Sequence, residues 1–224
     1  GLDGAEVHAV HEGYLLDQFT TKYTNRRTDQ YGGTFDNRYR FAKEVVEEIK
    51  RQCGDTFPVS LRYSVTSKTI SFGIGAVYGE KFTEAGRDLE EGLKAAKYLQ
   101  DAGYDMLNAD NGTYDSWYWA HPPVYMPLNC NMAEVTRLKE VVEISQSMLE
   151  GDYEKLRTNR MISVENYKMA SILTHTDIKE EDLPEGDEIN MCEAMDRLFQ
   201  RFENQGIEKG KREEKQNTLK EQLK

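Results

Sequence analysis

Short apolar runs alternate with segments of helical period along the first two thirds of the chain. Three runs have the length of a buried strand, namely residues 5–10, 57–62 and 104–109. Apolar residues recur every three or four positions over residues 39–52, 87–101 and 132–142, which predicts one amphipathic helix after each strand. Glycines at positions 54 and 103 follow the first two helices, as expected at helix ends.

This order of strands and helices predicts an α/β fold. Strands joined through helices take right-handed crossovers, so the three strands are expected to be parallel neighbours in one sheet. The order is typical of a barrel or a doubly wound sheet.

The pattern changes after Ile144. From Ser145 onward the chain is polar and helix-prone, with helices predicted over residues 164–173 and from about Met191, and no further strand is evident. The last segment, from Gly206, mixes charges of both signs with few apolar residues, which favours a solvated helix or frayed end over a coiled coil or a partner-binding helix. We therefore predict two parts, residues 1–144 and an α-helical region over residues 145–224.

The balance of charges excludes several kinds of partner. The 224 residues include 29 Lys and Arg against 40 Asp and Glu, a formal net charge of −11. Such a chain has no general attraction for nucleic acid or anionic membranes, so neither is expected as a partner. The sequence contains neither a long apolar run nor the pattern of a signal peptide, which predicts a cytoplasmic location.

Cysteines and the first residues add two expectations. Cys53, Cys130 and Cys192 are odd in number and widely spaced, which argues against a disulfide framework, a zinc site or an iron–sulfur cluster. The chain starts at Gly1 and enters a strand pattern almost at once, so we expect a fragment or a processed product.

Candidate chemistry gathers where the predicted strands end. His8 and His11 flank the end of the first strand and Tyr14 follows, an arrangement in which two imidazoles could hold an electron-rich oxygen and a phenol could deliver a proton. A metal site would need a third ligand that the spacing does not supply, so no metal is expected. Hydrogen-bonded histidines of purely structural role are the other alternative.

Two further features stand at strand ends. Arg62 is the last residue of the second predicted strand. Its guanidinium could stabilise negative charge on a bound group, and a structural salt bridge is the alternative. An aromatic loop over residues 114–119 follows the third strand, and Trp117 and Tyr118 in it could line a pocket for a large apolar substrate. Aromatic packing between loop and sheet is the alternative interpretation.

Two motifs resemble a known family. The run HAVHEGYLLDQF at residues 8–19 and the run TNRRTDQYGGTFDNRYRF at residues 24–41 are similar to the mid-barrel signature of the old yellow enzymes, which are flavin-dependent oxidoreductases. The form HEGY is shared with the bile-acid-inducible branch of NADH:flavin oxidoreductases and enoate reductases. The aromatic loop resembles the same branch.

The resemblance implies a function and roles for single residues. It implies FMN as cofactor, NADH as reductant, and hydride transfer to an activated alkene, either an enoate or a steroid-like enone. His8 and His11 would hydrogen-bond the substrate carbonyl, with Glu12 as an alternative to His11. Tyr14 would be the proton donor, and Arg62 would lie beside the flavin pyrimidine.

The resemblance covers residues 1 to about 144, or three β/α units of an eight-unit TIM barrel, and the family's phosphate-binding segments are not among them. Three units leave sheet edges open, so we expect a partial barrel of doubtful activity that could associate with itself through the open edge or the helical tail.

The second part resembles another family. The run INMCEAM at residues 189–195 is similar to the C-terminal end of the Rpn/transposase-associated nucleases of the PD-(D/E)XK superfamily. We therefore interpret the chain as a fusion of two truncated frames near Ile144. The alternatives to a flavoenzyme are a helical interaction protein, a nuclease-derived remnant without catalysis, and a non-functional fusion product.

Overall fold

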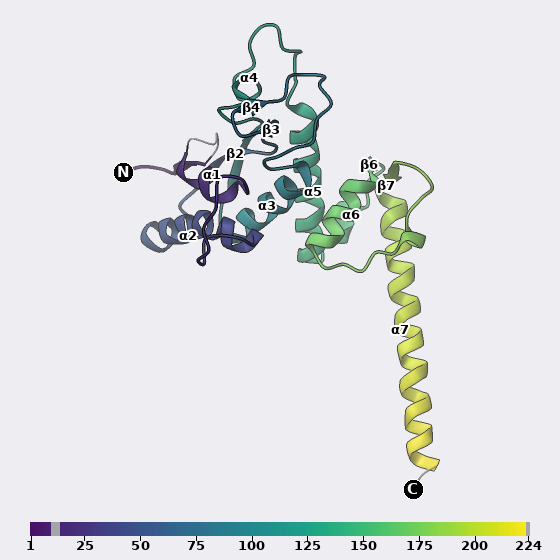
Figure 1. Ribbon diagram of the computed structural model, residues 1–224. Coiled ribbons are helices and arrows are strands. Elements are labelled where there is room, and N and C mark those ends of the chain that lie inside the picture. Colours follow the sequence, from purple (N-terminus) through teal and green to yellow (C-terminus); the bar gives the residue numbers. More distant parts are fainter. Residues whose placement is uncertain (10–13, 223–224) are drawn as a thin grey trace. The chain divides into compact units, whose positions relative to one another are not determined.

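The chain forms two compact units, Gly1–Val142 and Glu143–Lys224. The computed structural model describes residues 1–9 and 14–222, and side chains in these ranges except at positions 181 and 208–222 (Figure 1). The long helix α5 crosses the boundary between the units. Each unit is described by itself below.

Unit 1 is built on a parallel sheet with the order β1-β2-β5. In chain order its elements are β1 (Ala5–His8), α1 (Leu15–Thr20), α2 (Phe35–Cys53), β2 (Val59–Ser64), β3 (Thr69–Ser71), β4 (Ile74–Gly75), α3 (Leu89–Ala102), β5 (Met106–Asp110), α4 (Trp117–Ala120) and α5 (Met132–Glu150). The prediction of three parallel neighbouring strands is confirmed. The short elements α1, α4 and the β3–β4 hairpin were not predicted.

One face of this sheet is apolar and packs on helices. Val59, Leu61 and Tyr63 alternate along β2 and are buried, as expected of a strand whose alternate side chains face the core. The Tyr63 hydroxyl donates to the carbonyl of Gly92 in α3 at 2.5 Å. A Cβ at position 92 would lie 2.2 Å from the Val65 carbonyl oxygen, so only glycine allows α3 to approach the sheet this closely.

A buried guanidinium joins four elements of unit 1. Arg87, which precedes α3, is 3% exposed and donates to the Asp17 carboxylate of α1 at 2.7 Å. It also donates to the Tyr39 hydroxyl of α2 at 2.8 Å and to the Ser64 carbonyl of β2 at 2.6 Å. A charge this deep is tolerated only when it is paired and hydrogen-bonded, so the network fixes how α1 sits against the sheet.

A second buried ion pair reinforces the packing of α2 on α3. Arg38 of α2 donates to the Glu91 carboxylate of α3 at 2.7 Å, and Lys22 pairs with the same carboxylate at 2.8 Å. Burial alone would raise the pKa of Glu91, but the two cations outweigh it and the pKa is lowered. Glu91 is therefore held ionised in the pair.

Removal of the side chain that caps α3 is expected to weaken unit 1 modestly. Asp88 accepts a hydrogen bond from the Glu91 amide at 2.8 Å, which satisfies a helix N–H that has no partner within the helix. We expect Asp88→Ala to lower the free energy of unfolding by about 1 kcal/mol. Asp88→Asn keeps a capping oxygen and should change it by only a few tenths, as measured by urea unfolding followed by tryptophan fluorescence. Equal losses in both variants would contradict the capping role.

Unit 2 combines helices with a small hairpin. Beyond α5 it contains η1 (Tyr153–Leu156), β6 (Met161–Ser163), α6 (Val164–Leu173), η2 (Glu180–Asp182), β7 (Glu188–Asn190) and α7 (Met191–Gln222). β6 and β7 pair antiparallel, with Ile162 opposite Ile189. The expectation that no strand follows Ile144 was therefore wrong, because strands of three residues are too short to show a periodic pattern.

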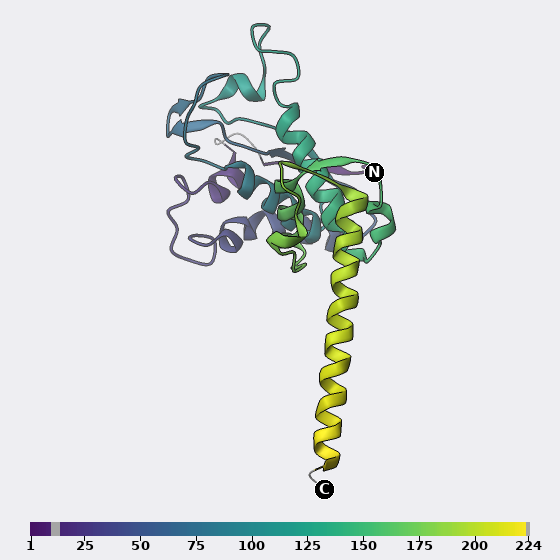
Figure 2. The same cartoon turned by 90° about the vertical axis from the view of Figure 1, so that its right-hand side faces the viewer.

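The core of unit 2 gathers apolar side chains from every part of it. Its largest fully buried members come from α5, both strands, α6 and the first turns of α7: Ile144, Ile162, Tyr167, Ile189, Met191, Met195 and Leu198. α7 continues beyond this core as one uninterrupted helix (Figure 2). Phe202 and Ile207, further along α7, are exposed.

Candidate functional site

The other face of the parallel sheet is polar. Strand register places Glu6, Ser60 and Met106 in one row and His8, Arg62 and Asn108 in the next, all on this face. Glu6, His8 and Met106 are exposed. Parallel sheets are normally covered on both faces, and a polar face of this kind is typical of a surface that lines a site.

Hydrogen bonds link the polar residues across the strands. The Glu6 carboxylate accepts from the Ser60 hydroxyl at 3.0 Å and from the Asn108 amide at 3.2 Å. The Asn108 amide oxygen accepts from Arg62 at 3.2 Å. The network runs across all three strands and ends at Arg62, near the carboxyl edge of the sheet.

Arg62 is positioned by two strands. Its side chain is 25% exposed and pairs with the Asp110 carboxylate of β5 at 2.5 Å. The salt bridge considered from the sequence is therefore present. The Nε atom of Arg62 is buried and has no hydrogen-bond partner among the described residues. The guanidinium thus keeps one donor for a further acceptor on the polar face.

His8 and Tyr14 meet at the same edge. Their rings are 4.3 Å apart between centroids and nearly perpendicular, at 89°. His8 ends β1, and Tyr14 is the residue that immediately precedes α1, so the buried Asp17–Arg87 pair of that helix also locates Tyr14. His11 and its alternative Glu12 lie outside the described residues, so their predicted roles stay predictions.

Three further rings extend from Tyr14 as a stack. Tyr14 lies 6.0 Å from Tyr114, Tyr114 lies 5.1 Å from Trp117, and Trp117 lies 4.0 Å from His121, with interplanar angles of 14°, 5° and 14°. The first two separations are those of favourable offset stacking, and the third is a closer ring contact. The structure therefore links Trp117 to Tyr14 through the ring of Tyr114. We call Tyr14, Tyr114, Trp117 and His121 the aromatic stack.

Tyr118 lies apart from the aromatic stack. Burial, with the nearby Glu80 carboxylate and Tyr125, raises the pKa of its phenol. Tyr118 and Trp117 are consecutive in the short helix α4 and so point in different directions. The structure thus gives these two predicted substrate-binding residues different surroundings.

Buried polar contacts hold the loop that carries Tyr114. The Ser116 hydroxyl accepts from the Thr113 amide at 2.8 Å and donates to the Ser67 carbonyl at 2.7 Å. The Ser64 hydroxyl at the end of β2 donates to the Gly112 carbonyl at 2.9 Å. Gly112 has a φ of +94°, a conformation that favours glycine. The loop is therefore tied to the end of β2 on both sides of Tyr114.

Sequence reasoning did not single out three residues of this site: Asn108, Asp110 and Tyr114, although Tyr114 begins the predicted aromatic loop. Period-two alternation along β5 was a usable signal for the first two, because it puts Asn108 and Asp110 on one face of a strand beside Arg62. No local signal pairs Tyr114 with Tyr14, because a hundred residues of chain separate them.

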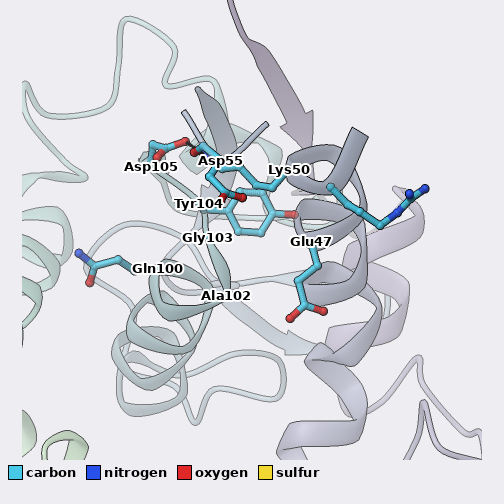
Figure 3. Close-up of a pocket in the computed structure, with 9 residues that line it drawn as sticks. Glu47, Lys50, Asp55, Gln100, Ala102, Gly103, Tyr104 and Asp105 are labelled. Carbon is cyan, nitrogen blue, oxygen red and sulfur yellow. Dashed lines mark hydrogen bonds and ion pairs between the residues drawn. The ribbon is translucent and has the colours of Figure 1, made fainter. Parts of the chain in front are cut away.

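A hollow of unit 1 lies at the opposite end of the sheet. It encloses about 680 Å³ between the ends of α2 and α3, and Lys50 and Asp105 in it are ion-paired at 2.6 Å (Figure 3). Lys50 also donates to the Phe57 carbonyl at 2.8 Å, and its ammonium lowers the pKa of Asp105. These contacts tie α2 to the amino ends of the strands, so we assign the hollow a structural role.

The described residues contain neither a helix suited to crossing a membrane nor a group of three or more metal-binding side chains.

Comparison with known proteins relates unit 1 to flavin oxidoreductases. Residues 1–111 match the NADH:flavin oxidoreductase / NADH oxidase family. A cinnamate reductase of Clostridium sporogenes is 56% identical over 144 residues, which cover 64% of this chain and 22% of that protein. An NADH oxidase of Thermoanaerobacter brockii is 36% identical over 143 residues, or 64% of this chain and 20% of that protein.

Among solved structures, a 2-naphthoyl-CoA reductase complex shares 32% identity over 52% of this chain and 16% of that one, with a TM-score of 0.43. The predicted relationship to old yellow enzymes and enoate reductases is thus confirmed for the first part of the chain. The chain spans about a fifth of the length of the two curated relatives named above. The nuclease resemblance of residues 189–195 stays a prediction.

Proposed function

We propose that unit 1 carries the substrate end of a flavin-dependent ene-reductase site, within a partial TIM barrel of three β/α units. The observation that supports this most is the meeting of His8, Tyr14 and Arg62 at the carboxyl edge of one polar sheet face. Active sites of β/α barrels are built at that edge. The polar face corresponds, in this proposal, to the inside of the barrel.

One residue of the polar face, Arg62, is suited to contact the flavin ring of FMN. Arg62 offers a buried donor without a partner among the described residues, and its positive charge suits the electron-rich end of a flavin ring. Asn108 lies within hydrogen-bonding distance of Arg62 and would keep the guanidinium oriented. Bound FMN would supply the hydride, with NADH as its source.

The chain's own residues would hold and protonate the substrate. His8 would donate a hydrogen bond to the substrate carbonyl and so draw electron density from the adjacent double bond. Tyr14 would donate its phenolic proton to the carbon next to that carbonyl. His11 is the proposed second donor to the carbonyl, with Glu12 as the alternative.

The aromatic stack suggests the class of substrate. Tyr114 and Trp117 present ring faces beside Tyr14, and flat apolar groups pack well against such surfaces. Tyr118 is proposed as a further wall residue. The relative named cinnamate reductase fits an enoate with an apolar or aromatic substituent, and we propose this class for the site.

Flavin binding tests the proposal directly. We expect the chain to shift the absorption band and quench the fluorescence of added FMN. Arg62→Ala should weaken this binding about 10- to 100-fold, because a hydrogen bond to a charged group is lost.

Arg51→Ala is the matched control for this experiment. Arg51 lines the hollow at the amino ends of the strands, so its loss should leave FMN binding unchanged. If added FMN keeps an unshifted absorption spectrum and its full fluorescence in the presence of the protein, the enzyme proposal for this chain is wrong. If Arg51→Ala loses FMN binding and Arg62→Ala does not, FMN binds at the amino ends of the strands and not at the polar face.

A further inference from the structure

Tyr14 has a phenolic neighbour that the proposed reaction does not yet use. The ring of Tyr114 is stacked 6.0 Å from that of Tyr14, and the two side chains are hydrogen-bonded to each other. Tyr14 is 37% exposed and Tyr114 is 50% exposed. Both side chains are therefore open to solvent, that of Tyr114 more than that of Tyr14.

The direction of this hydrogen bond matters for the chemistry. The hydrogen bond to Tyr14 raises the pKa of Tyr114 above its ordinary value, with smaller contributions from burial and from the charge on Tyr14. When Tyr14 gives its proton to a substrate its oxygen becomes a phenolate, which can only accept, so Tyr114 is then the donor and Tyr14 the acceptor. Each phenol has one hydrogen, so Tyr114 can return one proton to Tyr14.

We propose that Tyr114 is a positioning residue that acts through Tyr14, aiming the Tyr14 proton at the substrate and replacing it afterwards. This inference rests on the proposed ene-reductase function. It goes beyond that function because it assigns the route by which the proton donor is restored. A planar substrate lying over Tyr14 would cover its exposed part, whereas Tyr114 would keep contact with water.

The proton steps balance without a further reactant. The O–H bond of Tyr14 breaks as a C–H bond forms on the substrate, which leaves Tyr14 as a phenolate. The Tyr114 proton then moves to the Tyr14 oxygen along the existing hydrogen bond. Tyr114 takes a proton from water at its exposed side, and hydroxide passes to the buffer.

The loop around Tyr114 keeps the two phenols in place. Trp117 stacks on the far side of the Tyr114 ring at 5.1 Å and 5°, so the ring lies between two others. The Ser116 hydroxyl anchors the loop to the Ser67 carbonyl, and both residues are buried. Loss of the Tyr114 hydroxyl should therefore remove the hydrogen bond and leave the stacking intact.

Tyrosine titration tests the pair without any cofactor. With the Cζ carbons labelled and assigned through single Tyr→Phe variants, we expect Tyr114 to titrate above its ordinary pKa of about 10. Tyr14→Phe should lower the pKa of Tyr114 toward that value, and Tyr125→Phe, in the exposed segment after α4, should not. A Tyr114 pKa that is the same in the wild type and in Tyr14→Phe would overturn the inference.

Turnover tests the role of the pair. With FMN bound and cinnamate as the probe, Tyr114→Phe should slow reoxidation of the reduced flavin about fivefold to tenfold, the effect of one neutral hydrogen bond. It should also shift the pH profile of that step and leave reduction by NADH unchanged. Tyr125→Phe should match the wild type in both half-reactions.

The two failures are distinguishable. A wild-type chain that binds no FMN removes the proposed function, and the titration still shows whether the phenol pair exists. A chain that binds FMN and reduces cinnamate equally fast with Phe at position 114, with an unchanged pH profile, overturns the role of Tyr114 alone.

Discussion

Arg87→Met is expected to destabilise unit 1 by about 3–5 kcal/mol. The substitution keeps a long side chain but leaves the Asp17 carboxylate, which is 1% exposed, without its cation. The Tyr39 hydroxyl and the Ser64 carbonyl lose a hydrogen bond as well. An uncompensated buried charge dominates this loss, because the low dielectric around it offers no substitute for water.

Tryptophan fluorescence makes this measurement specific. The chain has two tryptophans, Trp117 and Trp119, and both lie in unit 1, so urea unfolding followed by this signal reports that unit alone. Arg51→Ala is the control, since its pair with Glu48 is exposed and screened by water, and its loss should leave the free energy of unfolding almost unchanged. Similar losses in the two variants would show that the Arg87 network does not hold unit 1 together.

A double variant sharpens the interpretation. If Asp17 and Arg87 act as one ion pair, Asp17→Asn combined with Arg87→Met should cost less than the sum of the two single losses, because neither charge is then left buried alone. Additive losses would mean that each residue stabilises the fold through separate contacts.

Tyr14→Phe is expected to have the largest effect on activity. If Tyr14 supplies the proton, its loss should lower the rate of cinnamate reduction about 10²- to 10⁴-fold, the usual contribution of a general acid. The ring should keep its contact with His8, because the phenolic oxygen takes no part in ring packing. FMN binding should therefore be unchanged, and the loss should be confined to the oxidative half-reaction in stopped-flow measurements.

Tyr78→Phe is the matched control for this variant. Tyr78 is an exposed tyrosine in the segment after β4, and its hydroxyl has no role in the proposed chemistry. Its removal should leave both half-reactions unchanged. Full activity in Tyr14→Phe would assign proton delivery to another group and would also remove the basis for the Tyr114 inference.

The main elements of unit 1 were predictable because their signals are long and repeated. The helices α2 and α3 are amphipathic over several turns, and each pattern extends to within a few residues of the observed ends. The strands β1, β2 and β5 follow as short apolar runs between them. Other short elements, such as α1, the β3–β4 hairpin and β6–β7, lack a distinct apolar run, span too few positions to show a period, and were missed.

The candidate site was predictable only in part. His8, Tyr14 and Arg62 stand at strand ends in the sequence, and the topology of parallel strands brings such ends to one edge. Their partners were not predictable in the same way. The hydrogen bond from Arg62 to Asn108 and the one between Tyr14 and Tyr114 join residues far apart along the chain, and they depend on the register of β2 and β5 and on one loop conformation.

By itself the sequence determined the local elements, the parallel order of three strands and the residue types available for chemistry, because periodicity and turn residues act over a few neighbouring positions. Tertiary structure alone decided how the polar side chains of the sheet are joined, that Asp110 is the carboxylate that pairs with Arg62, and that Tyr14 is joined to a second phenol. Those features arise from side chains brought together by register, helix packing and the buried Arg87 network, and such contacts leave no periodic trace in the chain.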